Sequence, residues 1–337
     1  MKSSVNPSAK LFSKLSLKLL TSLVLLGFSI SLQAAGHRSL SGLMRESFKN
    51  KDFVALVDTA DYRLGDEWGK VRVTDNMMLH ETPVFQRAVK ATAYYAGATA
   101  FYLGKFNGHH IMATNYHVSG TSCQGPVSFA FLEKSFQCET LYGSWKAVDL
   151  ALFSIEVSPA DEAALLEQGR NFAYDVPIYP GQQLLTVGFG IAGNPQSQLM
   201  VNQDSDCKVF SDTGDFRLMA DPDEVHPGSY KAWSFINGCD GSHGDSGSAF
   251  VDRKTGDVLG LVWTGKIPKS KKAGSSAYLD KIFRDRSPEI WTELTFSVPA
   301  AKIREHIRKV LESSSVTDQD IVKTLSAVIE SSGRVSK

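Results

Sequence analysis

The chain has 337 residues, of which 42% are hydrophobic and 21% are charged, a composition that suits one large globular domain with extensions. Basic and acidic residues are equal in number, 36 of each. The first 35 residues contain four of the lysines and no acid, so their removal leaves a net charge of −4. Because binding to phosphates needs net or clustered positive charge, this balance argues against a nucleic-acid partner.

The N-terminus has the order of an export signal. Four lysines precede a 14-residue apolar run, Leu19–Leu32, which is followed by Gln33-Ala34-Ala35. The run is short for a membrane span, and the small residues after it suit cleavage by signal peptidase. We expect residues 1–35 to be a removed signal peptide, with an uncleaved membrane anchor as the alternative. The mature protein is then periplasmic or secreted, without membrane contact.

Short β patterns separated by glycines fill the middle of the chain. From Ala88 to His117, β-branched and aromatic residues are dense and are interrupted by glycines. Similar runs recur at Val127–Leu132, Asp149–Glu156, Leu184–Phe189, Ser248–Val251 and Val258–Trp263. Many short strands with glycine turns are typical of an all-β barrel or sandwich.

The two ends of the chain differ from this β-rich middle. Helical spacing is clear at Ala300–Leu311, directly after Pro299, and is weaker from Thr317 to Ser331. The stretch Gly36–Thr82 is more polar and irregular. It is open whether that stretch is a propeptide, a linker or a strap along a barrel.

All four cysteines lie in the exported part of the chain, where an oxidising compartment allows pairing. They are Cys123, Cys138, Cys207 and Cys239. Of the three connectivities, we expect Cys123–Cys138 and Cys207–Cys239, because each pair closes a short or medium loop within β structure. Free buried thiols are the alternative.

Three segments carry the residue types that a serine nucleophile needs. An apolar strand ends in a small turn that presents His117, a lone acid, Asp149, lies at an apolar strand, and a glycine-rich turn exposes Ser246. Such catalysis requires a base beside the serine, a carboxylate that orients the base, and backbone N–H groups facing the developing oxyanion. The order is His, Asp, Ser, with gaps of 32 and 97 residues.

Together these segments resemble the His, Asp and Ser motifs of the trypsin/chymotrypsin-like serine peptidases. The resemblance is strongest to the bacterial branch with the glutamyl endopeptidases and the HtrA-type proteases, and it covers about residues 86–312. It implies an all-β fold of two six-stranded antiparallel β-barrels with a C-terminal helix. Residues 36–85 are then an N-terminal extension or propeptide, and residues 313–337 a C-terminal helical tail.

The resemblance also implies roles for individual residues. Ser246 attacks the scissile carbonyl, His117 carries the proton, and Asp149 orients His117. The backbone N–H groups of Gly244 and Ser246 form the oxyanion hole. Thr264 and Gly265 belong to the strand that pairs with the substrate backbone.

Two further acids near the nucleophile match trypsin-type positions. Asp240, six residues before Ser246, matches the acid at the base of the specificity pocket and predicts cleavage after Arg or Lys, with a small or apolar preference as the main rival. Glutamyl specificity is not expected, because Val262 stands where the glutamyl endopeptidases have a histidine. Asp245 matches the acid that pairs with a newly cut N-terminus in zymogen activation, although it is equally expected as a simple turn cap.

Other sites and functions fit less well. His109, His110 and His117 lack the flanking pattern of a metal site, and the Gly188–Gly193 spacing of a dinucleotide loop is followed by Asn194-Pro195 where a helix is required. We therefore expect no metal and no cofactor. The lysines of Lys266–Lys272 read as a solvated loop, with recognition of acidic substrate groups as the alternative.

The expected partners are polypeptide substrates, and the oligomeric state is open. A catalytically silent binding protein on the same fold is the main rival function. Such a protein would be expected to have an altered His, Asp or Ser, and none of the three is altered here. An esterase or other acyl hydrolase is a third possibility. It would be expected to carry the Gly-x-Ser-x-Gly nucleophile elbow with the order Ser, Asp, His, whereas His comes first here.

Overall fold

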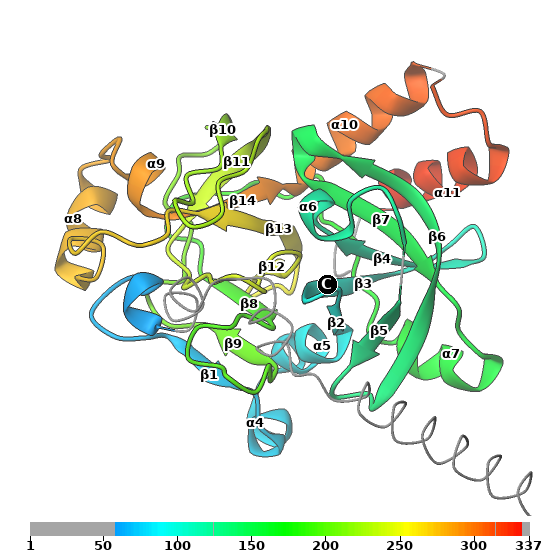
Figure 1. Ribbon diagram of the computed structural model, residues 1–337, viewed down its shortest axis with the longest axis horizontal. Helices are drawn as coiled ribbons and strands as arrows, with labels where there is room; N and C mark the ends of the chain where they lie inside the picture. Colours follow the sequence, from blue (N-terminus) through cyan, green and yellow to red (C-terminus); the bar gives the residue numbers. More distant parts are fainter. Residues whose placement is uncertain (1–57, 124, 314, 332–337) are drawn as a thin grey trace, which may run out of the picture. The chain divides into compact units, whose positions relative to one another are not determined.

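A computed structural model describes residues 58–123, 125–313 and 315–331, which all belong to one compact unit (Figure 1). The expected signal peptide, residues 1–35, and the first part of the expected extension, residues 36–57, lie outside the described residues.

The first half of this unit is a closed barrel of six antiparallel strands, as the sequence predicted. The strands pair in the order β2-β3-β4-β7-β6-β5. Their bounds are β2 Thr92–Tyr95, β3 Ala98–Phe106, β4 His109–Thr114, β5 Pro126–Phe129, β6 Lys134–Trp145 and β7 Leu150–Ile155. The turn between β3 and β4, Asn107-Gly108, has positive φ at both residues, which suits the twist of a tight hairpin. Large aromatic side chains such as Tyr95, Tyr102 and Phe153 fill the interior.

The second half is an antiparallel sheet of eight strands in the order β1-β9-β8-β12-β13-β14-β11-β10. Their bounds are β1 Lys70–Arg72, β8 Leu184–Gly188, β9 Met200–Asn202, β10 Arg217–Ala220, β11 Lys231–Asn237, β12 Ala249–Asp252, β13 Val258–Gly265 and β14 Thr295–Pro299. Six strands were expected here. The two additional strands, β1 and β10, lie at the edges, and β1 comes from the segment before the first barrel.

Helices surround these sheets. Only the last two were predicted from the sequence: α10 (Ala300–Glu312), which follows Pro299, and α11 (Gln319–Glu330), whose first turn is capped by the Asp318 side chain. The others are η1 Thr59–Asp61, α4 Asp75–His80, α5 Pro83–Ala91, α6 Tyr116–Ser119, η2 Lys146–Val148, α7 Pro159–Leu166, α8 Ser276–Arg284 and α9 Ile290–Glu293. Among the described residues, no helix is long and apolar enough to cross a membrane.

The described part of the N-terminal extension is folded into the second sheet. Tyr62 and Leu64 are fully buried, and β1 pairs with β9. Helix α5 runs across the expected domain boundary at residue 86 and buries Phe85 and Val89. From Asp58 onwards, these contacts are those of a strap rather than of a linker.

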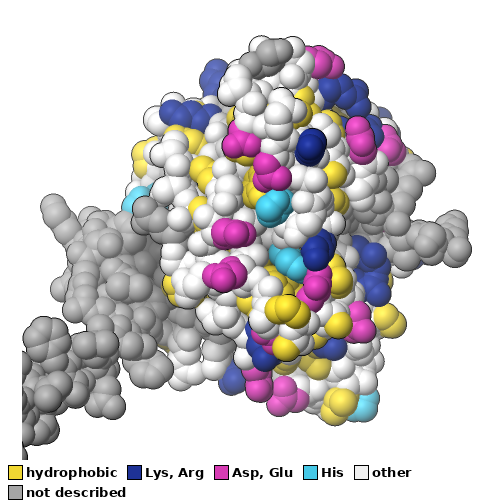
Figure 2. All heavy atoms as spheres, turned by 90° about the vertical axis from the view of Figure 1, so that its right-hand side faces the viewer, with side chains coloured by type: hydrophobic (Ala, Val, Ile, Leu, Met, Phe, Trp, Pro, Cys, Tyr) yellow, Lys and Arg dark blue, Asp and Glu magenta, His cyan; other side chains and the backbone are white. Residues whose placement is uncertain are grey.

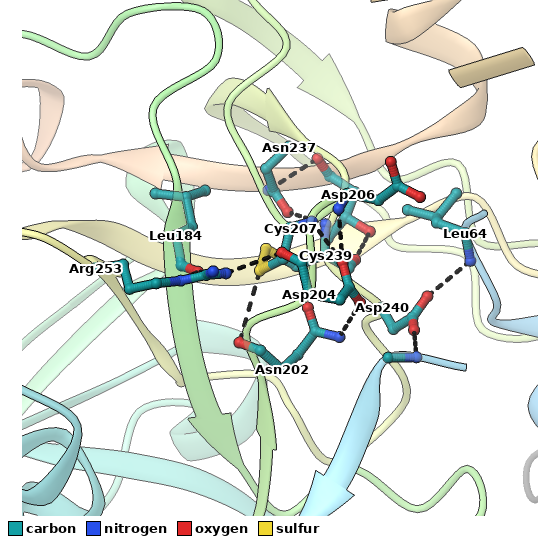
Figure 3. The surroundings of a disulfide bond; sticks show 12 residues. Leu64, Leu184, Asn202, Asp204, Asp206, Cys207, Asn237, Cys239, Asp240 and Arg253 are labelled. Carbon is teal, nitrogen blue, oxygen red and sulfur yellow. Dashed lines mark hydrogen bonds between the residues drawn. A yellow bond between two sulfur atoms is a disulfide. The ribbon is translucent and has the colours of Figure 1, made fainter. Parts of the chain in front are cut away.

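Both expected disulfides are present, Cys123–Cys138 and Cys207–Cys239. The first ties the loop after α6 to β6. The second fixes the start of the loop that leads to Ser246 (Figure 3). The face shown in Figure 2 carries Lys and Arg as well as Asp and Glu side chains in its described part.

Candidate active site

Ser246 lies in the loop between β11 and β12, which is held by both halves of the fold. Thr99 on β3 donates from its backbone N–H to the Ser246 carbonyl (3.0 Å) and from its hydroxyl to the Gly244 carbonyl (2.8 Å). Gly244 has a φ of 92°, and a Cβ there would lie 2.6 Å from the carbonyl oxygen of Phe189. Only glycine fits this turn without strain.

The turn leaves two backbone donors free. Neither the N–H of Gly244 nor that of Ser246 has a hydrogen-bond acceptor within the described parts of the chain. Buried or half-buried N–H groups are nearly always paired in folded proteins, so two free ones beside a serine form a site for a negatively charged oxygen.

His117 is presented by the short helix α6, which begins directly after β4 and Asn115. The imidazole is 35% exposed, and its Nε2 lies 2.8 Å from the Ser246 hydroxyl oxygen. Its Nδ1 lies 2.8 Å from Asp149 Oδ2. Because an ionised carboxylate only accepts hydrogen bonds, Nδ1 donates to Asp149, and Nε2 is left to accept the proton of Ser246.

Asp149 stands between η2 and β7 in a left-handed backbone conformation, with φ 34° and ψ 50°. Its side chain is fully buried and accepts three hydrogen bonds. Besides the His117 ring, the backbone N–H of His117 (3.1 Å) and the hydroxyl of Tyr230 (2.8 Å) donate to Oδ1. These donors compensate the cost of burying the charge and fix the direction of the carboxylate.

The environment of His117 raises its pKa. Burial of the imidazole acts downward, but the charge of Asp149 and its hydrogen bond, together with the charges of Asp221 and Asp223, outweigh it. The site therefore stabilises the protonated imidazolium, which is the form that appears when His117 takes a proton from the serine.

The structure brings the three predicted residues together in one hydrogen-bonded chain, Ser246 to His117 to Asp149. His117 and Asp149 come from the first barrel and Ser246 from the second sheet. A hydroxyl beside a base, a base held by a carboxylate, and two free N–H groups are the parts needed for acyl transfer through a serine nucleophile.

Tyr230 was not predicted. It directly precedes β11, 81 residues from Asp149 in the sequence, and its hydroxyl reaches across from the second sheet. No local pattern marks such a residue, since a tyrosine before a strand usually signals only packing.

Asp240 was expected at the base of a specificity pocket, but its carboxylate is not open to such a pocket. Its side chain is buried, and its two oxygens accept the backbone N–H groups of Leu64 (2.7 Å) and Gly69 (2.6 Å) (Figure 3). Burial raises its pKa to about 7, although the two N–H groups counteract the shift. A carboxylate with both oxygens engaged by the chain itself is not available to a cationic substrate side chain.

A lysine lies where that pocket was expected. The backbone of Gly265 pairs with Thr295, and a Cβ on Gly265 would be 3.2 Å from the ammonium of Lys269. That ammonium donates to the Thr295 hydroxyl at 3.3 Å. Burial lowers the pKa of Lys269 to about 8, with nearby acids, Asp240 first, acting upward, so it is still mainly charged at neutral pH. Thr264 donates from its hydroxyl to Asp221.

The histidines considered for a metal site are separated. His109 lies beside Asp320, His110 beside the hydroxyl of Tyr102, and His117 beside Asp149. Across the described ranges, no group of three or more His, Cys, Asp or Glu side chains is arranged to hold a metal ion. The Gly188–Gly193 segment, considered above as a dinucleotide loop, begins at the last residue of β8 and is followed by turns and not by a helix.

Comparison with known proteins identifies the class. Residues 98–261, which include His117, Asp149 and Ser246, match the family model of the trypsin-like peptidase domain. Residues 98–261 therefore form a trypsin-like peptidase domain, and this domain supports the assignment of the protein as a serine endopeptidase. No curated protein matches its sequence.

The solved structures that match this chain are distant from it in sequence. An inactive form of the Rv3671c protease of M. tuberculosis is 17% identical, with a TM-score of 0.45, and the match covers 69% of this chain and 95% of the other. The HtrA-type protease AlgW bound to a decapeptide is 20% identical, with a TM-score of 0.40, over 64% of this chain and 51% of the other.

The raised pKa of His117 predicts the acid limb of the pH profile. Since His117 must be neutral to act as a base, kcat/KM should fall as the pH drops through a value above the ordinary 6.5 of histidine. Asp221→Asn removes one of the charges that raise this pKa, so the midpoint should move to lower pH. Asp285→Asn, at an exposed acid directly after α8, is the control. A midpoint that stays in place or rises in Asp221→Asn contradicts this electrostatic account.

The contact between Tyr230 and Asp149 predicts a loss of activity in Tyr230→Phe. A hydrogen bond to a charged group contributes about 1.5–3 kcal/mol, so kcat/KM should drop roughly 10-fold or more while the protein stays folded. Tyr142→Phe, whose hydroxyl contacts Asp320 on α11, is the matched control. Activity within twofold of the parent would show that Asp149 is held adequately without this hydroxyl.

Proposed function

We propose that this serine endopeptidase cleaves peptide bonds with Ser246 as nucleophile, His117 as general acid and base, and Asp149 as the residue that orients His117. The observation that carries the proposal is the hydrogen-bonded chain of these three side chains, 2.8 Å at each step, beside two free backbone N–H groups.

The geometry supports the following sequence of steps. The Ser246 oxygen bonds to the scissile carbonyl carbon while its proton passes to His117 Nε2, and the carbonyl oxygen takes up negative charge facing the N–H groups of Gly244 and Ser246. When the C–N bond breaks, His117 returns the proton to the leaving amine, and an acyl-enzyme ester remains. Water then attacks this ester with His117 again as base, which releases the acid product and restores Ser246.

The catalytically silent binding protein is the rival that the site disfavours. A binding protein needs no base oriented toward a serine, whereas here the hydrogen bond to Asp149 turns Nε2 of His117 toward the Ser246 hydroxyl.

The preference for Arg or Lys, inferred from Asp240, is not supported by the geometry, because the strap engages that carboxylate. We propose instead that Thr264 and Gly265 flank the side chain of the cleaved residue, and that the ammonium of Lys269 beside Gly265 repels a cationic one. Like charges in a poorly solvated pocket interact strongly, which makes such repulsion an effective source of selectivity.

We also propose that the protein acts outside the cytoplasm, in the periplasm or as a secreted enzyme. The support is the export pattern of residues 1–35 together with two disulfides, since disulfides persist in oxidising compartments.

The proposed nucleophile predicts that Ser246→Ala abolishes hydrolysis and leaves the fold intact, because a loop hydroxyl is removed and no core contact is lost. Purified protein is assayed with a peptide library and an activated ester, and labelled with a fluorophosphonate. Ser313→Ala, an exposed serine after α10, serves as the control and should behave as the parent. Parent protein that neither hydrolyses nor labels would contradict the proposed function.

For specificity, we expect arginyl substrates to be the poorest in a panel of arginyl, glutamyl, alanyl and phenylalanyl peptides. Lys269→Met removes the repelling charge at similar volume, so the ratio of arginyl to alanyl kcat/KM should rise about 10-fold. Lys271→Met, in the exposed part of the same loop, is the matched control. An arginyl preference in the parent that Lys269→Met leaves unchanged would restore the expectation drawn from Asp240.

A further inference from the structure

Residues Tyr62–Arg72, here called the strap, contact the loop that carries the nucleophile at three side chains. This loop, Cys239–Ser246, is the nucleophile loop. Its residues Asp240, His243 and Asp245 each accept a hydrogen bond from the strap. No other described segment contacts all three of these side chains through hydrogen bonds.

The central contact is a buried ion pair between Lys70 on β1 and Asp245. The side chains are only 2% and 5% exposed. Asp245 also accepts the backbone N–H of Gly190 (3.1 Å) and of Ser242 (2.8 Å), so its carboxylate connects the nucleophile loop to the segment after β8. Lys70 is the one cation paired with Asp245 in the described chain. Such a pair requires both members, because removal of one leaves an uncompensated charge in the interior.

Two further contacts fix the strap on either side of this pair. Asp240 holds the strap backbone at Leu64 and Gly69 (Figure 3). The Tyr62 hydroxyl lies 2.9 Å from His243 Nδ1, and His243 Nε2 lies 2.7 Å from Asp223. Since Asp223 accepts the proton of Nε2, Nδ1 is free to accept from Tyr62.

Asp245 stands between the two residues whose N–H groups face the expected oxyanion. The position of its carboxylate therefore sets the direction of the peptide units around Gly244 and Ser246. In the trypsin-type pattern noted from the sequence, an acid at this position pairs with a newly cut N-terminus. Here that position is already occupied by the buried ammonium of Lys70, within a continuous chain.

We propose that the strap is an internal activator, in which Lys70 is a positioning residue that holds Asp245 and thereby the oxyanion-forming conformation, so that the chain is active without cleavage between the strap and the barrel. The proposal rests on the proposed role of Ser246 as nucleophile. It predicts the reverse of zymogen activation, because a cut directly after Lys70 would separate its ammonium from the peptidase domain and switch the enzyme off.

The first test uses the unmutated chain. Protein is labelled with a fluorophosphonate, and the intact mass of the labelled species is measured. We expect the labelled chain to retain the whole strap. Labelling only of species that begin after Lys70 overturns the inference while leaving Ser246 as the nucleophile. Absence of labelling in any species contradicts the proposed function instead.

The second test compares variants of β1. Lys70→Met should lower kcat about 100-fold or more with little change in KM, the range seen when an oxyanion donor is lost, and Lys70→Arg should recover most of the rate because it retains the cation. Arg72→Met, which removes an exposed charge from the same strand, should stay within twofold of the parent.

The outcomes of this comparison are distinct. Folded Lys70→Met with kcat near that of the parent overturns the proposal. If Lys70→Met does not fold, Lys70→Arg decides, since a folded arginine variant with parental kcat supports a requirement for the cation. A folded arginine variant that loses activity as completely as Ser246→Ala overturns it.

Discussion

The buried carboxylate of Asp149 is the constraint around which the site is organised. A charge taken out of water must be met by donors, and here the donors come from both halves of the fold: His117 from the first barrel and Tyr230 from the segment that enters the second sheet. The same contacts that make the burial tolerable also fix the imidazole beside Ser246. Stability of this contact between the two halves and alignment of the proposed catalytic groups are therefore one requirement.

The same solution recurs twice in the nucleophile loop. Asp240 and Asp245 are also buried, and each accepts at least one hydrogen bond from the strap, more than 170 residues away in the sequence. In all three cases a short polar side chain in the interior forces two distant segments to meet at a defined distance, because a missed hydrogen bond leaves a costly unpaired group. Apolar packing alone tolerates small shifts that such contacts do not.

Features with a local signature were predictable from the sequence. Five of the six strands of the first barrel, the helix at Ala300–Leu311, both disulfides and the three residues of the hydrogen-bonded chain each follow from alternation, capping, spacing or a motif. The longest strand of that barrel, β6, was not predicted. The partners Tyr230 and Lys70 have no such signature, because their roles exist only once the sheets are assembled. The role expected for Asp240 failed for the same reason. Its spacing from Ser246 matched that of a pocket acid, but the backbone N–H groups that bind its carboxylate come from the N-terminal strap, far away in the sequence. The helices α5, α7 and α8 were not predicted from the sequence.

The last helix, α11, is bound to residues around the first barrel, as the strap is bound to the second sheet. The buried amide of Asn171 donates to the carbonyls of Val328 and Ser331, both at 2.6 Å, and Asn107 donates to Asp320. The predicted domain end at residue 312 would remove these acceptors. A peptidase that meets other copies of itself is also a substrate, and proteolysis begins at extended, unpaired backbone. Within the described residues, β1 is paired with β9 and the end of α11 is bound by Asn171, so neither of these segments offers extended, unpaired backbone to another copy of the enzyme.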